Sequence, residues 1–204
     1  MRFGVLGTGT VGRTIAGKLT ELGHEVQVGS READEDKVTF AEAASFGEVV
    51  VNATAGTASL EALNAAGAAN LYGKVLIEVA NPLDFSKGMP PTLSVCNDTS
   101  LAEQIQEAFA EAKVVKALNT VNAAVMVTPE VVPGSHTIFV AGNDDGAKAQ
   151  VSELLQSFGW PAEDVMDLGD IAAARAMEMY LPLWLRLFGA TGTPQVNIKV
   201  LAAE

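Results

Sequence analysis

The feature that most constrains this chain is a glycine-rich segment that begins at its seventh residue. It fits the pattern G-x-G-x-x-G and consists of Gly7, Thr8, Gly9, Thr10, Val11 and Gly12. The preceding run, Arg2 to Leu6, reads as a strand buried on both faces of a parallel sheet. Apolar residues then recur at helical spacing until Gly23, which ends the predicted helix. This order of strand, glycine turn and helix predicts a dinucleotide-binding turn.

Each glycine of the segment has a separate physical role in such a turn. Gly7 permits the tight turn after the strand, and Gly9 lets backbone N–H groups approach a pyrophosphate. Gly12 allows the helix to pack closely on the sheet. We therefore expect residues 7–12 to bind the phosphates of a dinucleotide.

The rest of the chain alternates short apolar runs with helical patterns. This order predicts an α/β fold, a doubly wound parallel sheet of the Rossmann type with right-handed crossovers. The expected strands are Arg2 to Leu6, Glu25 to Val28, Glu48 to Asn52, Lys74 to Val79, Val114 to Ala117, Thr137 to Ala141 and Asp164 to Asp167. The expected helices after the first are Phe40 to Phe46, Thr57 to Ala66, Leu101 to Ala112 and Asp145 to Phe158.

The last part of the chain differs in composition from the rest. Ile171 to Phe188 reads as one long apolar helix that bends near Glu178 because of Pro182, and Gln195 to Leu201 reads as a final strand. We expect a dinucleotide-binding Rossmann domain over residues 1–168 and a small C-terminal helical lobe over 169–204. A helix that is apolar all round needs cover on more than one side, so this lobe is predicted to form a homodimer contact.

The end of the second predicted strand indicates which dinucleotide binds. Ser30 occupies the place where NAD enzymes carry an acidic residue, and Arg31 follows it. A carboxylate there would repel a 2′-phosphate, whereas a hydroxyl and a guanidinium would bind it with charge-assisted hydrogen bonds. We therefore predict a preference for NADP(H) over NAD(H).

Two further loops leave the carboxyl edge of the predicted sheet, where doubly wound folds bind ligands. Ala53 and Thr54 follow the strand that ends at Asn52, and Asn81 and Pro82 follow the strand that ends near Val79. We expect Ala53 and Thr54 to contact the ribose or nicotinamide, and Asn81 with Pro82 to lie near the nicotinamide.

Composition excludes several other classes of function. The chain has 13 Lys+Arg against 25 Asp+Glu, a net charge of -12, so we expect neither nucleic acids nor anionic membrane surfaces as partners. A single cysteine, Cys96, and two histidines argue against a disulfide framework and a metal site. The predicted location is the cytoplasm. The sequence offers no obvious acid–base pair, and we assign no catalytic side chain, which suits hydride transfer between two rings.

On these residues the chain resembles the NADPH-dependent reductases of the deazaflavin coenzyme F-420, also called F-420:NADP oxidoreductases. The segments that carry the resemblance are residues 7–12, 22–31, 114–120 and 175–201. It implies hydride transfer between NADPH and a flavin-like ring held between the Rossmann domain and the C-terminal lobe. By the same resemblance Ser30 and Arg31 hold the 2′-phosphate, and the segment after Lys116, which includes Asn119, faces the acceptor.

The resemblance leaves the acceptor open among coenzyme F-420, FMN and FAD. Only about ten residues separate Arg31 from the next helix, so the helix and strand that larger members carry there are expected to be missing. Two alternatives remain: a non-catalytic NADP-binding sensor or regulatory module, and a reductase of a small carbonyl or imine substrate.

Overall fold

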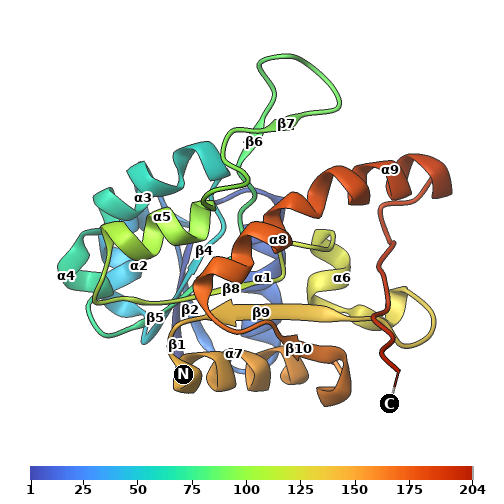
Figure 1. Ribbon diagram of the computed structural model, residues 1–204. Helices are drawn as coiled ribbons and strands as arrows, with labels where there is room; N and C mark the ends of the chain where they lie inside the picture. The colour runs from blue at the N-terminus through green and yellow to red at the C-terminus, as the bar shows by residue number, and fades with distance from the viewer. Residues whose placement is uncertain (204) are drawn as a thin grey trace.

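The computed structural model describes residues 1–203, and Figure 1 shows a central sheet with helices on both faces. Within these residues the main sheet has eight strands in the order β10-β9-β8-β5-β4-β1-β2-β3. The strands are β1 (Arg2–Leu6), β2 (Glu25–Ser30), β3 (Val38–Thr39), β4 (Val49–Asn52), β5 (Val75–Glu78), β8 (Lys113–Ala117), β9 (Ile138–Gly142) and β10 (Val165–Asp167). This mostly parallel sheet confirms the predicted α/β fold of the Rossmann type.

Alternation along the strands divides the core between the two faces of the sheet. On one face Phe3 and Val5 of β1 pack with the helices α1 (Thr10–Glu21), α6 (Ala123–Val127) and α7 (Asp145–Ser157). On the other face Leu6, Val50 and Leu76 pack with a second group of helices. That group comprises α2 (Phe40–Phe46), α3 (Ser59–Ala66), α4 (Ala68–Leu71), α5 (Leu101–Ala108) and the start of α8 (Ala174–Met179).

Strands β9 and β10 depart from the predicted parallel arrangement. β9 pairs antiparallel with β8, and β10 runs parallel to β9, so both run opposite to the rest of the sheet. The connection from β8 to β9 contains only α6 and a 3-10 turn at Pro129–Val131. Within this connection α6 packs against α1, and the chain then enters β9 antiparallel to β8.

Several predicted boundaries need correction. The helix expected over Leu101 to Ala112 ends at Ala108, and the one expected from Thr57 begins as a 3-10 turn, Gly56–Ala58, before α3. The segment between Arg31 and Phe40, expected to lack a strand, contains the two-residue β3, which pairs with the end of β2. A small hairpin that sequence reasoning missed, β6 (Leu83–Asp84) with β7 (Thr92–Leu93), projects from the body (Figure 1).

The C-terminal lobe contains two helices where one was predicted. A 3-10 turn (Ile171–Ala173) leads into α8, which ends at Met179, and α9 (Leu181–Thr191) follows with Pro182 in its first turn. Proline cannot donate the hydrogen bond that would continue α8, so the chain breaks at Tyr180. Leu183 on α9 is 52% exposed, and the predicted homodimer stays a prediction.

The predicted strand over Gln195 to Leu201 is wrong. This segment forms an isolated backbone hydrogen bond from Thr137 N–H to the carbonyl of Ile198 at 2.8 Å, which is not a strand ladder. A side chain also attaches this segment to the body of the protein, because Nδ2 of Asn197 donates to the carbonyl of Thr137 at 2.8 Å. None of the helices in residues 1–203 combines the length and apolar composition needed to cross a membrane.

Candidate functional site

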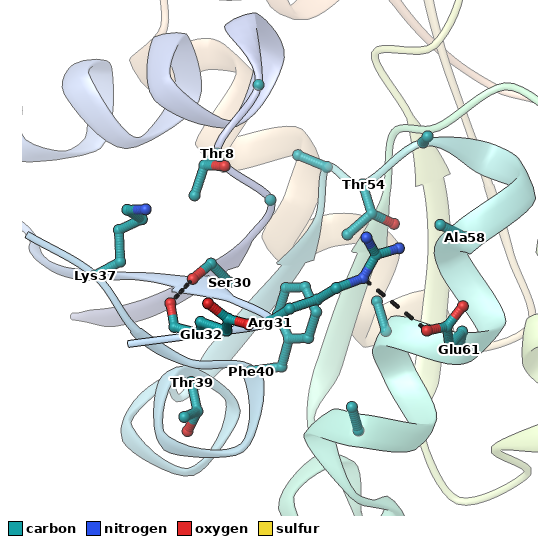
Figure 2. Close-up of a pocket in the computed structure, with 16 residues that line it drawn as sticks. Thr8, Ser30, Arg31, Glu32, Lys37, Thr39, Phe40, Thr54, Ala58 and Glu61 are labelled. Carbon is teal, nitrogen blue, oxygen red and sulfur yellow. Dashed lines mark hydrogen bonds and ion pairs between the residues drawn. The ribbon is translucent and has the colours of Figure 1, made fainter. Parts of the chain in front are cut away.

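A cavity of about 670 Å³ opens at the carboxyl edge of the sheet, where β1 and β4 lie side by side (Figure 2). The chain runs from β1 outward to β2 and β3 and then returns to β4, so the strand order reverses at this point. Doubly wound sheets bind ligands at such a reversal. The cavity is lined by Gly7, Thr8, Gly9, Ser30, Arg31, Glu32, Lys37, Thr39, Phe40, Ala53, Thr54, Ala55, Ala58, Glu61, Ala62 and Ala65.

The glycine turn has the geometry that a phosphate-binding turn requires. Gly7 has φ +118°, and a Cβ atom at Gly12 would lie 2.1 Å from the carbonyl oxygen of Gly7, so a side chain is excluded at both. At Gly9 a Cβ atom would meet no atom within 4 Å, because this residue borders the open cavity. Gly9 is also the N-cap of α1 and has no side chain to bind the first N–H groups of the helix. These groups are thus available to an anion.

The far end of the same cavity carries the residues expected to select the cofactor. Ser30 donates its hydroxyl to the carbonyl of Glu32. Arg31 reaches across the cavity, and its Nε lies 4.0 Å from Oε1 of Glu61 on α3 (Figure 2). Both side chains are largely exposed, 71% and 76%, so the guanidinium is free to exchange this carboxylate for another anion.

Lys37 is a second cation at this end that sequence reasoning missed. It lines the cavity beside Thr8 and Ser30 (Figure 2). Its Nζ lies 2.6 Å from Oδ2 of Asp34, and this hydrogen bond lowers the pKa of Asp34 below its ordinary value. The available signal was a lone lysine six residues after Arg31 in an otherwise acidic segment.

A second cavity, of about 320 Å³, continues from the first and shares Ala53, Thr54 and Ala55 with it. Its lining side chains are apolar, amide or hydroxyl groups. They come from α1, from the loops after β4, β5 and β8, from α6, from the hairpin and from α9. The residues are Val11, Ala53, Thr54, Ala55, Gly56, Thr57, Val79, Ala80, Asn81, Leu83, Phe85, Asn119, Val121, Asn122, Ala123, Met126, Leu181 and Trp184.

Two amides hold one wall of the second cavity together. The Nδ2 of Asn81 donates to the carbonyl of Asn119 at 2.8 Å, and the Nδ2 of Asn119 donates to Oδ1 of Asn81 at 2.9 Å. Asn119 also donates to the carbonyl of Met177 at 3.0 Å, which ties this wall to α8. The preceding residue, Leu118, has φ +64°, a strained conformation for leucine that persists only where the surroundings impose it.

The structure brings most of the predicted site residues together at the two cavities. Gly7, Thr8, Gly9, Ser30 and Arg31 line the first, Val11, Asn81 and Asn119 line the second, and Ala53 and Thr54 line both. The other three lie beside them. Thr10 is exposed at the start of α1, Gly12 is buried against Gly7, and Pro82 is buried on the loop that packs against Gly56.

A row of buried polar side chains lies behind the second cavity and was not predicted. Asn52, Glu78 and Lys116 are register partners on the adjacent strands β4, β5 and β8, and each is fully buried. Burial raises the pKa of Glu78 to about 7 although Lys116 and hydrogen bonds from Asn52 and Ala80 oppose the change. The sequence signal was a single charged residue inside each of two apolar runs, residues 75–80 and 114–118.

Comparison with known proteins identifies relatives of this chain. Residues 2–82 match the family model described as NADP oxidoreductase, coenzyme F420-dependent. A crystal structure from Arthrobacter sp. FB24, provisionally identified as an F420-dependent NADP-reductase, is 52% identical. The match covers 99% of this chain and 100% of that one, with a TM-score of 0.94.

Two curated relatives match with lower coverage of their own length. The F420-dependent NADP reductase of Methanocaldococcus jannaschii is 33% identical over 118 residues, 57% of this chain and 52% of that protein. The metalloreductase STEAP3 of Rattus norvegicus is 29% identical over 196 residues, 90% of this chain and 38% of that protein. The chain thus spans about half or less of the length of these two relatives.

Proposed function

Because the chain belongs to the family of F420-dependent NADP oxidoreductases, we propose that it transfers a hydride between NADPH and a flavin or deazaflavin acceptor of the F420 type. The observation that carries the proposal is the pair of cavities that join at Ala53–Ala55. The first suits the phosphates and ribose of a dinucleotide, and the second suits a flat ring. Their junction lies at the reversal of strand order, next to the glycine turn.

The residues of the first cavity fit NADP(H). The open space over Gly9 and the free N–H groups of α1 suit a pyrophosphate. Ser30, Arg31 and Lys37 provide a hydroxyl and two cations for a 2′-phosphate at the far end. Fixed hydrogen-bond donors would thus bind the central pyrophosphate of the ligand, and a mobile guanidinium would bind its 2′-phosphate.

The residues of the second cavity suit ring binding rather than proton transfer. Leu181 and Trp184 of α9 and Phe85 of the hairpin offer apolar surface, and Asn81, Asn119 and Thr54 offer polar atoms that fix orientation. When bound, NADPH supplies the hydride itself. The protein then holds donor and acceptor rings in contact and excludes water, which is the contribution that hydride transfer requires from it.

The first test is cofactor selection. Arg31→Ala removes a charge-assisted contact to the 2′-phosphate and should weaken NADPH binding by about 10- to 150-fold, while NADH binding stays nearly unchanged. Arg2→Ala is the matched control, because Arg2 pairs with Glu48 at the amino end of β1, away from the cavity. Equal affinity of the unaltered protein for NADPH and NADH, measured by calorimetry, would refute the assignment.

The second test is turnover, followed by the loss of NADPH absorbance with F420, FMN, FAD or riboflavin. We expect NADPH oxidation only when a flavin or deazaflavin is present. Tight NADPH binding without oxidation by any of them would instead favour a non-catalytic sensor. Oxidation of NADPH by a small imine or carbonyl compound would instead favour a reductase of that class of substrate.

A further inference from the structure

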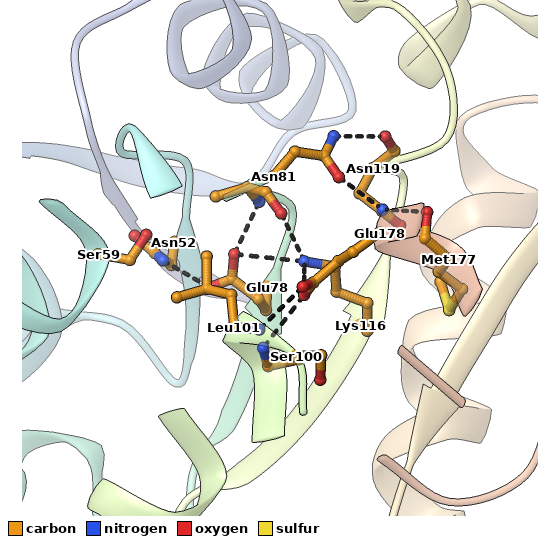
Figure 3. Close-up of polar contacts among 12 residues, drawn as sticks. Asn52, Ser59, Glu78, Asn81, Ser100, Leu101, Lys116, Asn119, Met177 and Glu178 are labelled. Carbon is orange, nitrogen blue, oxygen red and sulfur yellow. Dashed lines mark hydrogen bonds and ion pairs between the residues drawn. The ribbon is translucent and has the colours of Figure 1, made fainter. Parts of the chain in front are cut away.

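Three charged side chains meet in the interior directly behind the second cavity (Figure 3). Glu78 and Lys116 are 0% exposed, and Glu178 is 1% exposed. They come from β5, β8 and α8, so the group joins the sheet to the C-terminal helices. We call Glu78, Lys116 and Glu178 the buried charge cluster.

Every member of the cluster is held by hydrogen bonds. Oε1 of Glu178 lies 2.8 Å from Nζ of Lys116 and accepts from the N–H of Ala102 at 3.2 Å, and Oε2 accepts from the N–H of Leu101 at 2.8 Å. Glu178 therefore also satisfies two of the free N–H groups at the N-terminus of α5. Oε1 of Glu78 lies 3.8 Å from Nζ of Lys116.

The cluster reaches the cavity wall through Ala80, which lines the second cavity. Lys116 donates to the carbonyl of Ala80, and Glu78 accepts from the N–H of the same residue at 2.7 Å. Glu78 also accepts from Nδ2 of Asn52, whose Oδ1 accepts from the hydroxyl of Thr54 at 2.7 Å. Both routes therefore lead from Glu78 to residues that border the proposed ring site.

The cluster is unbalanced in charge, with two carboxylates against one ammonium. When all three are ionised it carries one negative charge in excess, in a place where little water can screen it. The pKa of Glu78 is raised to about 7, so the excess charge develops as the pH rises through neutrality. The neighbouring ion pair on α5 and α8, Glu103 with Arg175, is internally balanced and only partly buried.

We propose that the buried charge cluster sets the relative affinity of the site for oxidised and reduced dinucleotide, because its excess negative charge stabilises the cationic ring of NADP⁺. This inference rests on the proposed function, since it requires the nicotinamide to bind in the second cavity. Loss of a hydride, two electrons and one proton, leaves the ring with a positive charge that NADPH lacks. The cluster thus favours hydride donation by bound NADPH.

The test measures the dissociation constants of NADP⁺ and NADPH by calorimetry. Glu78→Gln keeps the shape of the side chain and removes its charge. At pH 8 we expect this change to raise the ratio of the constant for NADP⁺ to that for NADPH by about three- to tenfold. Glu48→Gln, an exposed carboxylate paired with Arg2 at the amino end of the sheet, should leave the ratio unchanged.

The unaltered protein provides a second measurement that needs no variant. Its ratio should fall between pH 6 and pH 8 as Glu78 ionises, whereas the ratio for Glu78→Gln should stay flat. The 2′-phosphate also titrates near pH 6, but both forms of the cofactor carry it, so its effect cancels in the ratio.

The outcomes separate the two proposals. If both dinucleotides bind but the ratio is the same in both proteins at every pH, the cluster has only a structural role and the inference fails. If neither dinucleotide binds the unaltered protein, the proposed function fails and the inference fails with it.

Discussion

The two ends of the candidate site each contain an ion pair between a cation and a carboxylate, but one pair is exposed to solvent and the other is buried. Arg31 and Glu61 face each other across the first cavity at 4.0 Å with 71% and 76% of their side chains exposed. Lys116 and Glu178 meet at 2.8 Å behind the second cavity with 0% and 1% exposed. An exposed pair contributes less than about 1 kcal/mol, whereas a buried pair is costly to break because it leaves a charge without a partner.

Because one ion pair is exposed and the other is buried, the two halves of the site differ in rigidity. The Arg31 end is adjustable, since water and a ligand phosphate can each replace Glu61 at little cost. The Lys116 end is fixed, since hydrogen bonds from three strands and two helices hold it. A dinucleotide bound across both cavities would meet a mobile cation at its 2′-phosphate and a rigid wall at its reacting ring.

The largest effect is expected from removing the buried cation. Lys116→Met leaves Glu78 and Glu178 buried without their positive partner, and it should lower the free energy of unfolding by about 3 to 5 kcal/mol. Urea denaturation measures this loss through the midpoint of the transition.

Lys113→Met is the matched control on the same strand. Lys113 pairs with Asp144 at 3.0 Å, but its side chain is 45% exposed, so a much smaller loss is expected. Equal losses for the two variants would show that burial does not distinguish the lysines.

The next effect concerns the pH dependence of stability. The pKa of Glu78 is raised from 4.5 to about 7 in the folded protein, chiefly by burial. The stability associated with this group is therefore fully present below about pH 4.5 and is lost as the pH rises through 7. Glu78→Gln does not titrate, so between pH 5 and 8 its stability relative to the unaltered protein should rise by about 2 kcal/mol.

Glu42→Gln separates this effect from ordinary carboxylate titration. Hydrogen bonds from Thr39 lower the pKa of Glu42 below its ordinary value of 4.5. The stability that ionised Glu42 contributes is therefore present above pH 4.5 and is lost only as the pH falls through the lowered pKa. The difference between this variant and the unaltered protein should be constant from pH 5 to 8. A constant difference for Glu78→Gln as well, in thermal unfolding at several pH values, would contradict the buried, raised pKa.

The two halves also differ in how far the sequence predicts them. The glycine turn, Ser30 and Arg31 follow from short patterns, because the strand, turn and helix that place them are adjacent in the chain. The residues of the buried charge cluster are between 38 and 100 positions apart in the chain, so no short sequence pattern predicts that they meet. Its strand members were visible only as Glu78 and Lys116 inside apolar runs, and their pairing requires the register of β5 with β8.

The reversed direction of β9 shows a second limit of sequence reasoning. Thr137 to Ala141 was correctly predicted as a strand, within one residue of the observed bounds. Its direction depends on the connection before it, where α6 packs against α1 instead of crossing the sheet. Apolar periodicity identifies an element, but contacts between distant elements decide how it is oriented.

The smallest effect should come from the exposed pair. Glu61→Gln removes the carboxylate that competes for Arg31 and that would repel a 2′-phosphate, so NADPH should bind up to about fivefold more tightly, with NADH unchanged. The gain should shrink at 1 M salt, where the Debye length falls to about 3 Å, and it should be largely absent in the Arg31→Ala background, because the competition requires Arg31. Calorimetry on the two single variants and the double variant measures this coupling. Weaker NADPH binding by Glu61→Gln would mean that the carboxylate contacts the ligand directly, and the first cavity would then be as fixed as the second.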